Sequence, residues 1–146
     1  MDDVTTAANL FRDGCACSQA VLGAFAARVG LDRDHAIRMA AGFAGGMRQG
    51  EVCGAVTGAY MVLGLAHGTE ACTTAEGRAP VYAAVTAFAA EFRRRRGSVV
   101  CRDLLGCDIS TADGLRTAQE QGLFATTCVQ AVQDAAEIVE GLLPRT

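Results

Sequence analysis

The segment EVCGAVTGAYMVLGLAH, which runs from Glu51 to His67, decides how the rest of this chain folds. Its apolar run is too short to cross a membrane, since a membrane-spanning helix needs about 20 apolar residues. Because the segment is apolar nearly all round, it predicts a buried helix that other elements cover on every side. We therefore expect this helix to be the hydrophobic centre of the fold, and we expect no membrane span.

Within that segment, the motif CGAVTG places Gly54 and Gly58 one helical turn apart, with Cys53 and Thr57 beside them. Small residues leave a bare face on which another backbone or a cofactor can approach closely. The motif alone leaves open whether this face serves helix packing or cofactor contact. If a cofactor lies there, the expected binding residues are Gly54, Thr57 and Gly58.

The sequence on both sides of this segment also predicts helices. Alanine is the commonest residue, only two prolines occur, and the one notable β-branched pair is Val99-Val100. Apolar residues recur at helical spacing in three further stretches, and Asp32 or Asp34 is placed to cap a shorter helix. The glycine-rich residues 42–50 are predicted to be a loop or a helix interruption, and residues 98–122 a short helix after Val100 followed by an irregular stretch. We predict one all-α domain over residues 1–146 with about five helices, the first ending near residue 29 and the others at about 32–41, 51–67, 74–96 and 124–143.

The composition excludes several classes of function. Of the 146 residues, 51% are hydrophobic and 20% are charged, which is typical of one folded domain. The net charge of -3 argues against a polyanion-binding surface, so nucleic acid is not an expected partner. No lysine is present, which excludes Schiff-base, phosphate-loop and kinase-type lysine chemistry. The acidic opening MDDVTT does not resemble a signal peptide, so we expect a cytoplasmic protein.

Seven cysteines are the unusual feature of the composition. In the reducing cytoplasm, cysteine enrichment more often serves metal binding or redox chemistry than structural disulfides. Cys17 and Cys128 lie on apolar helical stripes. Cys101 is expected near the start of a short helix capped by Ser98, where the helix dipole and Arg102 would lower the pKa of its thiol. A single buried cysteine is usually only a small apolar residue, but several such cysteines in one chain weigh against that interpretation.

Several stretches carry a resemblance to a known family: DGCACSQAVLGAF (13–25), GFAGGMRQGEVCGAVTGAYMVLGL (42–65), CRDLLG (101–106) and the helix around Cys128. Together they resemble the bacterial C_GCAxxG_C_C family of redox-active proteins, and the resemblance covers nearly the whole chain. The family is named for four cysteines, which the resemblance places at Cys17, Cys53, Cys101 and Cys128.

Three cysteines lie outside the family pattern, namely Cys15, Cys72 and Cys107, and Ala16 stands where the family commonly has asparagine. Members of the family are similar to part of the split-Soret cytochrome, which carries haem. This chain has no CxxCH motif, so covalent c-type haem is excluded.

Two main classes of function remain. In the first, the four thiols form one metal site, because soft thiolates select iron–sulfur centres or zinc and four of them complete either ligand shell. We prefer an iron–sulfur cluster for electron transfer, since structural zinc sites usually have short paired spacings. In the second, the same cysteines stay metal-free and cycle between thiol and disulfide in a redox carrier or sensor. The lack of a CxxC motif weighs against this alternative.

A third class is a helical interaction module with inert buried thiols. In both redox classes the protein acts with a redox partner that the sequence does not identify, and two copies could share one site as a homodimer. The sequence leaves open whether the protein is an enzyme.

Overall fold

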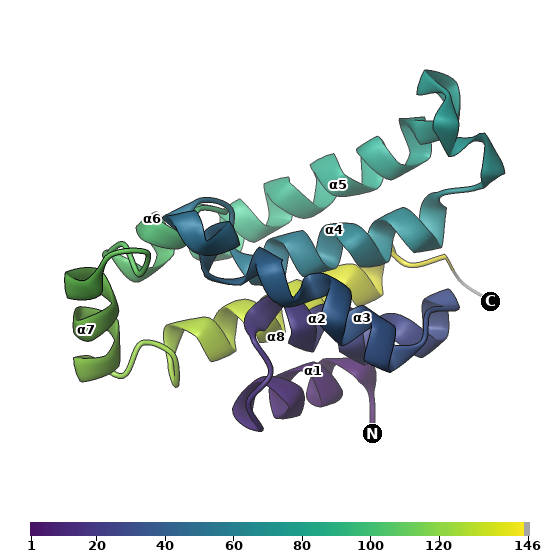
Figure 1. The fold of residues 1–146 in the computed structure, drawn as a ribbon. Helices are drawn as coiled ribbons and strands as arrows, with labels where there is room; N and C mark the ends of the chain where they lie inside the picture. Colours follow the sequence, from purple (N-terminus) through teal and green to yellow (C-terminus); the bar gives the residue numbers. More distant parts are fainter. Residues whose placement is uncertain (145–146) are drawn as a thin grey trace.

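The computed structural model describes residues 1–144, and every regular element in that range is helical (Figure 1). The α-helices, in chain order, are α1 (Asp3–Arg12), α2 (Cys17–Phe25), α3 (Arg33–Ala40), α4 (Gly54–His67), α5 (Ala75–Arg96), α6 (Cys101–Leu105), α7 (Ala112–Glu120) and α8 (Thr127–Leu142). Short helical segments between them are η1 (Ala26–Val29), η2 (Ala41–Phe43), η3 (Gly46–Gly50) and η4 (Glu70–Thr73). The prediction of an all-α chain is confirmed.

Local capping explains where several helices begin and end. The Asp32 carboxylate accepts a hydrogen bond of 3.0 Å from the His35 amide at the start of α3. Thr74 caps α5 in the same way, and α5 ends at Gly97, which has a φ of +89°. These boundaries match the predicted ones because capping residues act within one turn of chain.

The prediction of about five helices is wrong, and the differences have local causes. The first predicted helix is divided into α1 and α2, because Gly14 has a φ of +118°, which an α-helix cannot contain. The stretch that we expected to be irregular contains α7. Thr111 caps α7 by accepting a hydrogen bond of 3.0 Å from the Gly114 amide.

The helix at the centre of the core is α2, not α4. It packs against α1, α3, α4 and α8, and its side chains of Val21, Leu22 and Phe25 are fully buried. Helix α4 is buried toward α2 and α8, but Leu65 near its end is 47% exposed. The expectation that α4 is covered on every side is therefore corrected: neighbours cover only part of its circumference.

The helices form two groups around this core. Helices α4, α5 and α8 pack against one another, while α3 packs against α2 and α1 packs against both α2 and α8, which joins the two groups. The short helices α6 and α7 lie at the end of the molecule where α8 begins (Figure 1). Within residues 1–144, no helix is both long and apolar enough to span a membrane.

Candidate functional site

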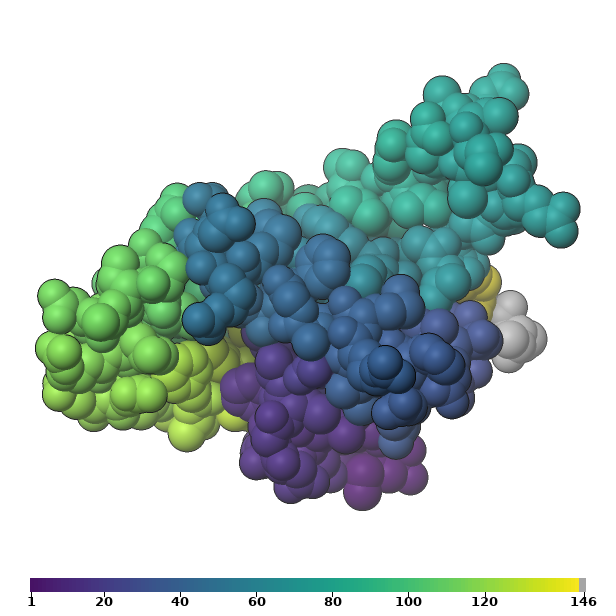
Figure 2. Space-filling model, in the orientation of Figure 1, coloured from purple at the N-terminus to yellow at the C-terminus, as the bar shows by residue number. Residues whose placement is uncertain are grey.

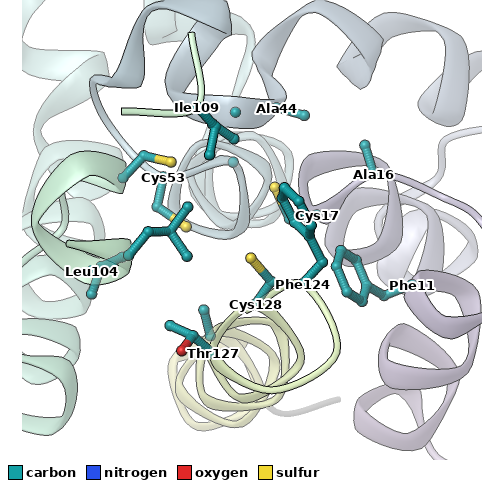
Figure 3. A pocket seen from close by; sticks show the side chains of 15 residues that line it. Phe11, Ala16, Cys17, Ala44, Cys53, Leu104, Ile109, Phe124, Thr127 and Cys128 are labelled. Carbon is teal, nitrogen blue, oxygen red and sulfur yellow. The ribbon is translucent and has the colours of Figure 1, made fainter. Parts of the chain in front are cut away.

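The candidate site is a cavity of about 140 Å³ that four cysteines line (Figure 3). Figure 3 shows the side chains of Cys17, Cys53 and Cys128 pointing into this space from different parts of the chain. The other walls are mainly apolar. The lining residues are Phe11, Ala16, Cys17, Ala44, Gly45, Cys53, Gly54, Cys101, Leu104, Leu105, Ile109, Phe124, Thr127, Cys128 and Ala131.

Each of the four cysteines stands at the beginning of a helix. Cys17 is the first residue of α2, Cys53 is the N-cap of α4, Cys101 is the first residue of α6, and Cys128 is the second residue of α8. The first amides of a helix have no partner within it and give its start a partial positive charge. The starts of α2, α4 and α8 therefore favour negative charge in the cavity, either on thiolates or on a bound group.

Cys17 has the most acidic thiol of the four. A hydrogen bond from the Cys53 side chain and further hydrogen bonds from the backbone amides of Gly45 and Ser18 lower the pKa of Cys17 from 9.0 to about 6. Burial acts in the opposite direction but is the weaker effect. At neutral pH the metal-free protein thus holds a thiolate at Cys17.

The other three thiols stay protonated at neutral pH. The pKa of Cys53 is raised well above 9.0, because its thiol donates a hydrogen bond to Cys17 and because it is buried. Burial, reinforced by the nearby charge of Cys17, raises the pKa of Cys101 to about 11 and that of Cys128 to about 12. The expectation of a lowered pKa at Cys101 is therefore wrong, because burial outweighs the small effect of Arg102.

A short antiparallel bridge holds Cys53 next to Cys101. Val52 pairs with Val100, the Cys53 amide donates to the Val99 carbonyl at 2.8 Å, and the Cys101 amide donates to the Glu51 carbonyl at 2.6 Å. The Arg102 guanidinium also contacts the Glu51 carboxylate at 2.9 Å. This bridge fixes the starts of α4 and α6 relative to each other, although they are far apart in the sequence.

The glycine-rich segment forms a left-handed turn over the cavity. Gly45, Gly46, Met47 and Arg48 are consecutive residues with φ between 58° and 64°. A Cβ atom on Gly46 would lie 2.3 Å from the Glu51 amide nitrogen and 3.0 Å from the Cys101 Cβ, so only glycine fits there. The turn brings the Gly45 amide to the Cys17 sulfur. Our sequence reasoning missed this role, although the Gly45-Gly46 pair was the available signal.

The three residues expected to contact a cofactor lie in different surroundings. Gly54 lines the cavity, and a Cβ atom on it would lie 2.4 Å from the Cys17 sulfur. Gly58 packs against the backbone of Ser18, where a Cβ atom would lie 2.7 Å from the carbonyl oxygen. Thr57 donates hydrogen bonds to the carbonyls of Phe43 and Gly54. Of the three, only Gly54 borders the cavity, and the bare face of α4 serves mainly helix packing.

The three cysteines outside the family pattern do not line the cavity. Cys72 is exposed in η4, Cys15 is half-buried beside a second hollow that includes Phe11 and Phe124, and Cys107 is half-buried after α6. Apolar wall residues such as Ile109 and Phe124 were not predicted to line a site, because only the fold brings them together with all four cysteines.

The arrangement of donors bears on the kind of metal group that the site could hold. Within residues 1–144, no group of three or more His, Cys, Asp or Glu side chains is placed to hold one metal ion. Four thiolates around a single zinc ion would each lie about 2.3 Å from it. The cavity thiols are therefore not arranged as the ligand shell of a single ion.

The comparisons with known proteins place the chain in a family. No curated protein and no solved structure matches it. Residues 15–142 match the family described as "Putative redox-active protein (C_GCAxxG_C_C)", and all four cavity cysteines lie within that range. The chain therefore belongs to the C_GCAxxG_C_C family of redox-active proteins.

Proposed function

We propose that Cys17, Cys53, Cys101 and Cys128 hold an iron–sulfur cluster and that the protein transfers electrons. The observation that carries this proposal is that four thiols from four separate helix starts line one largely apolar cavity. Cysteine thiolates are the usual ligands of iron–sulfur clusters, and four of them complete the shell. No carboxylate or imidazole of the described residues lines the cavity to favour a harder metal ion.

The ligands of a cluster are spaced differently from those of a single metal ion. A cluster distributes its thiolate ligands over two or more irons, so those ligands lie farther apart than the ligands of a single ion. The thiols do not form a single-ion shell but do surround one cavity. This combination supports a cluster over a zinc ion.

The protein contributes binding, charge and exclusion of water. The bound cluster would supply one-electron transfer at its irons. Phe11, Leu104 and Phe124 form apolar walls that limit the access of water. The starts of α2, α4 and α8 offset negative charge in the cavity, which favours deprotonation of the thiols when metal binds.

A second function is favoured by one observation, the hydrogen bond between Cys53 and Cys17. In a metal-free protein, the Cys17 thiolate attacks a partner's disulfide, forms a mixed disulfide and releases one partner thiolate. Cys53 then loses its proton to water and attacks the Cys17 sulfur, which forms the Cys17–Cys53 disulfide and releases the second partner thiolate. The partner disulfide gains two electrons and the cysteine pair loses two.

Anaerobic purification followed by a visible spectrum and by iron, sulfide and zinc analysis tests the first proposal. We expect iron and sulfide in comparable amounts and absorbance that Cys53→Ser or Cys101→Ser abolishes. Cys72→Ser is the matched control and should keep the absorbance, because Cys72 lies on the surface in η4. Circular dichroism of each variant separates loss of the cluster from loss of the fold.

A colourless, metal-free protein would contradict the iron–sulfur proposal and lead to the second. Mass spectrometry after stepwise oxidation would then identify the first pair to oxidise. The second proposal expects Cys17 with Cys53, and any other first pair would contradict it. A protein with neither metal nor a reversible disulfide would leave the interaction module, with inert thiols, as the function.

A further inference from the structure

Helix α5 has an outer face that no other element of residues 1–144 covers. The helix packs against α4, α8 and η4, and its inner residues Ala84, Phe88 and Phe92 are buried. It runs along one edge of the molecule (Figure 1), where its surface is open in the space-filling view (Figure 2). The exposed residues of the central outer face are Ala79, Pro80, Tyr82, Ala83, Thr86, Ala87 and Ala90.

This outer face is unusual for a helix in contact with water, because none of its seven central residues is charged. One of these residues, Tyr82, has a large side chain and is nevertheless 58% exposed. Exposed helix faces normally carry charged side chains, whereas an uncharged face bounded by charges is typical of an interaction surface.

The two ends of the face carry opposite charges. Glu76 lies in the first turn of α5 and Arg93 in the last, and both side chains are exposed. Among residues 1–144, neither forms an ion pair, whereas Arg94, Arg95 and Arg96 all do. The charge of the face is therefore negative at one end and positive at the other.

We propose that α5 forms a homodimer by packing antiparallel against α5 of a second copy. The outer residues Glu76, Ala79, Ala83, Thr86, Ala90 and Arg93 follow one another at alternating intervals of three and four, which keeps them on one face of a helix. When two such helices run antiparallel about a centre between Ala83 and Thr86, the small residues face one another and the backbones can approach closely.

The charges of Glu76 and Arg93 favour antiparallel packing, and they favour a second copy of the chain as the partner. Antiparallel packing brings Glu76 of each copy to the Arg93 end of the other, so the pattern is complementary to itself, as a two-fold interface requires. Parallel packing would instead place Glu76 beside Glu76 and Arg93 beside Arg93, which is unfavourable. A face that is complementary to its own reversed copy needs no other protein to satisfy both charges.

The proposed interface is separate from the four-cysteine cavity, because no residue of α5 lines that cavity. Dimer formation is thus independent of the proposed function. Variants on the outer face should leave the metal content and the visible spectrum unchanged.

Sedimentation velocity of the full chain over a wide concentration range tests the proposal. We expect a reversible monomer–dimer equilibrium that weakens as salt concentration rises, since the end charges are exposed. Ala83→Glu should weaken the dimer at least about tenfold, because it places like charges close to the two-fold axis. Ala112→Glu makes the same charge change on the exposed start of α7 and is the matched control.

A charge exchange tests the orientation. Glu76→Arg alone and Arg93→Glu alone should each weaken the dimer, and the double variant should restore it, because the two charges then exchange places. Tyr82→Glu serves as a second central variant if Ala83→Glu fails to fold. A wild-type protein that stays monomeric, or a dimer that the central variants leave intact, would overturn the proposal.

Discussion

Cys17 and Cys101 are both the first residue of a helix, yet the structure shifts the pKa values of their thiols in opposite directions. Cys17 receives hydrogen bonds from Cys53 and from the Gly45 and Ser18 amides, which stabilise its thiolate. For Cys101 burial is the largest effect, and it destabilises the charged form. The direction of the pKa shift therefore depends on the hydrogen-bond donors that the fold brings to the sulfur, and not only on the position of the cysteine in its helix.

Alkylation of the metal-free, reduced protein should show this difference. Because only a thiolate reacts quickly, the reaction of Cys17 should follow a titration with a midpoint near pH 6. Cys101 and Cys128 should stay unreactive up to about pH 10, because their pKa values are raised to about 11 and about 12. Peptide mass spectrometry after short exposure to iodoacetamide gives each rate. Equal midpoints for all three cysteines would contradict the prediction.

Among the helices, close backbone contact determines how α4 packs against α2. Gly58 of α4 lies so near Ser18 of α2 that a Cβ atom would come within 2.7 Å of a carbonyl oxygen. Ser18 itself is fully buried and donates a hydrogen bond of 2.7 Å to the Ala40 carbonyl. The side chain of Ser18 thereby links α2 to the end of α3. The backbone of Ser18 is the surface against which α4 packs.

Two glycine variants in α4 should change stability in opposite directions. Gly58→Ala should lower the free energy of unfolding by about 1–3 kcal/mol, because the added methyl group forces α4 away from α2. Gly64→Ala, in the same helix, should raise it by about 0.5–1 kcal/mol, because among the described residues no atom beyond the adjacent helix backbone lies within 4 Å of its added Cβ, and alanine favours the helix.

Urea denaturation of both variants beside the wild type measures the two changes. A Gly58→Ala protein as stable as the wild type would show that the helices are not in close backbone contact.

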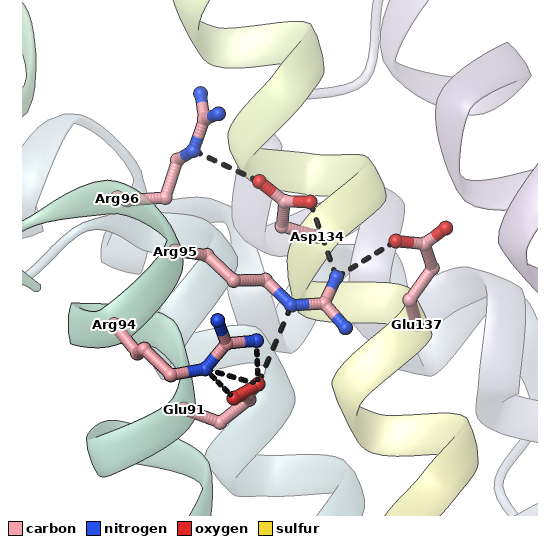
Figure 4. A network of polar contacts seen from close by, with 6 residues as sticks. All are labelled: Glu91, Arg94, Arg95, Arg96, Asp134 and Glu137. Atoms are coloured by element: carbon pink, nitrogen blue, oxygen red, sulfur yellow. Dashed lines mark hydrogen bonds and ion pairs between the residues drawn. The ribbon is translucent and has the colours of Figure 1, made fainter.

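At the scale of the whole molecule, charged groups join α5 to α8 (Figure 4). Asp134 on α8 lies 3.2 Å from Arg95 and 2.9 Å from Arg96, and its side chain is only 14% exposed. Arg95 also contacts Glu137 at 2.8 Å, and Glu91 faces Arg94 and Arg95 within α5. This network connects the C-terminal end of α5 to the middle of α8.

Replacing Asp134 should lower the stability of the protein more than replacing Glu137, which lies one turn further along α8. Asp134→Ala should lower the free energy of unfolding by about 1–2 kcal/mol, because it leaves Arg95 and Arg96 without their shared, mostly buried partner. Glu137→Ala is the matched control on the same helix. Glu137 is 52% exposed, so its loss should cost less than about 1 kcal/mol. Thermal unfolding at low and high salt compares the two variants, and equal losses would be inconsistent with a special role for Asp134.

The stability of the metal-free protein should pass through a maximum near pH 9. The pKa of Cys17 is lowered from 9.0 to about 6, so the unfolded chain binds more protons between these values and stability rises from pH 6 to pH 9. The pKa values of Cys101 and Cys128 are raised, so their contribution is present below pH 9 and is lost as the pH rises above it.

The rise between pH 6 and pH 9 should exceed about 1 kcal/mol and should be largely absent in Cys17→Ser. Urea denaturation in reducing, chelating buffers at several pH values measures it. A wild-type profile that is flat across this range would contradict the lowered pKa of Cys17.

Local patterns in the sequence were sufficient to predict the all-helical class, the boundaries of α3 and α5, and the family. Asp32, Thr74 and Gly97 act on the backbone within one turn, so their effect can be recognised without knowing the fold. Helical periodicity likewise identified α4 and α8 as amphipathic or buried elements. Thr111 was also recognisable as a capping residue, but the segment around it is polar, so α7 was not predicted.

Three features could not be predicted in this way: α2 is the central helix, Gly58 packs against Ser18 instead of bordering the cavity, and Cys17 has the acidic thiol. Each of these depends on groups that are distant in the sequence, such as the Gly45 amide at the Cys17 sulfur or the pairing of Val52 with Val100. Burial and hydrogen bonding are properties of the space around a residue, and that space is filled by whichever segments the folded chain brings together.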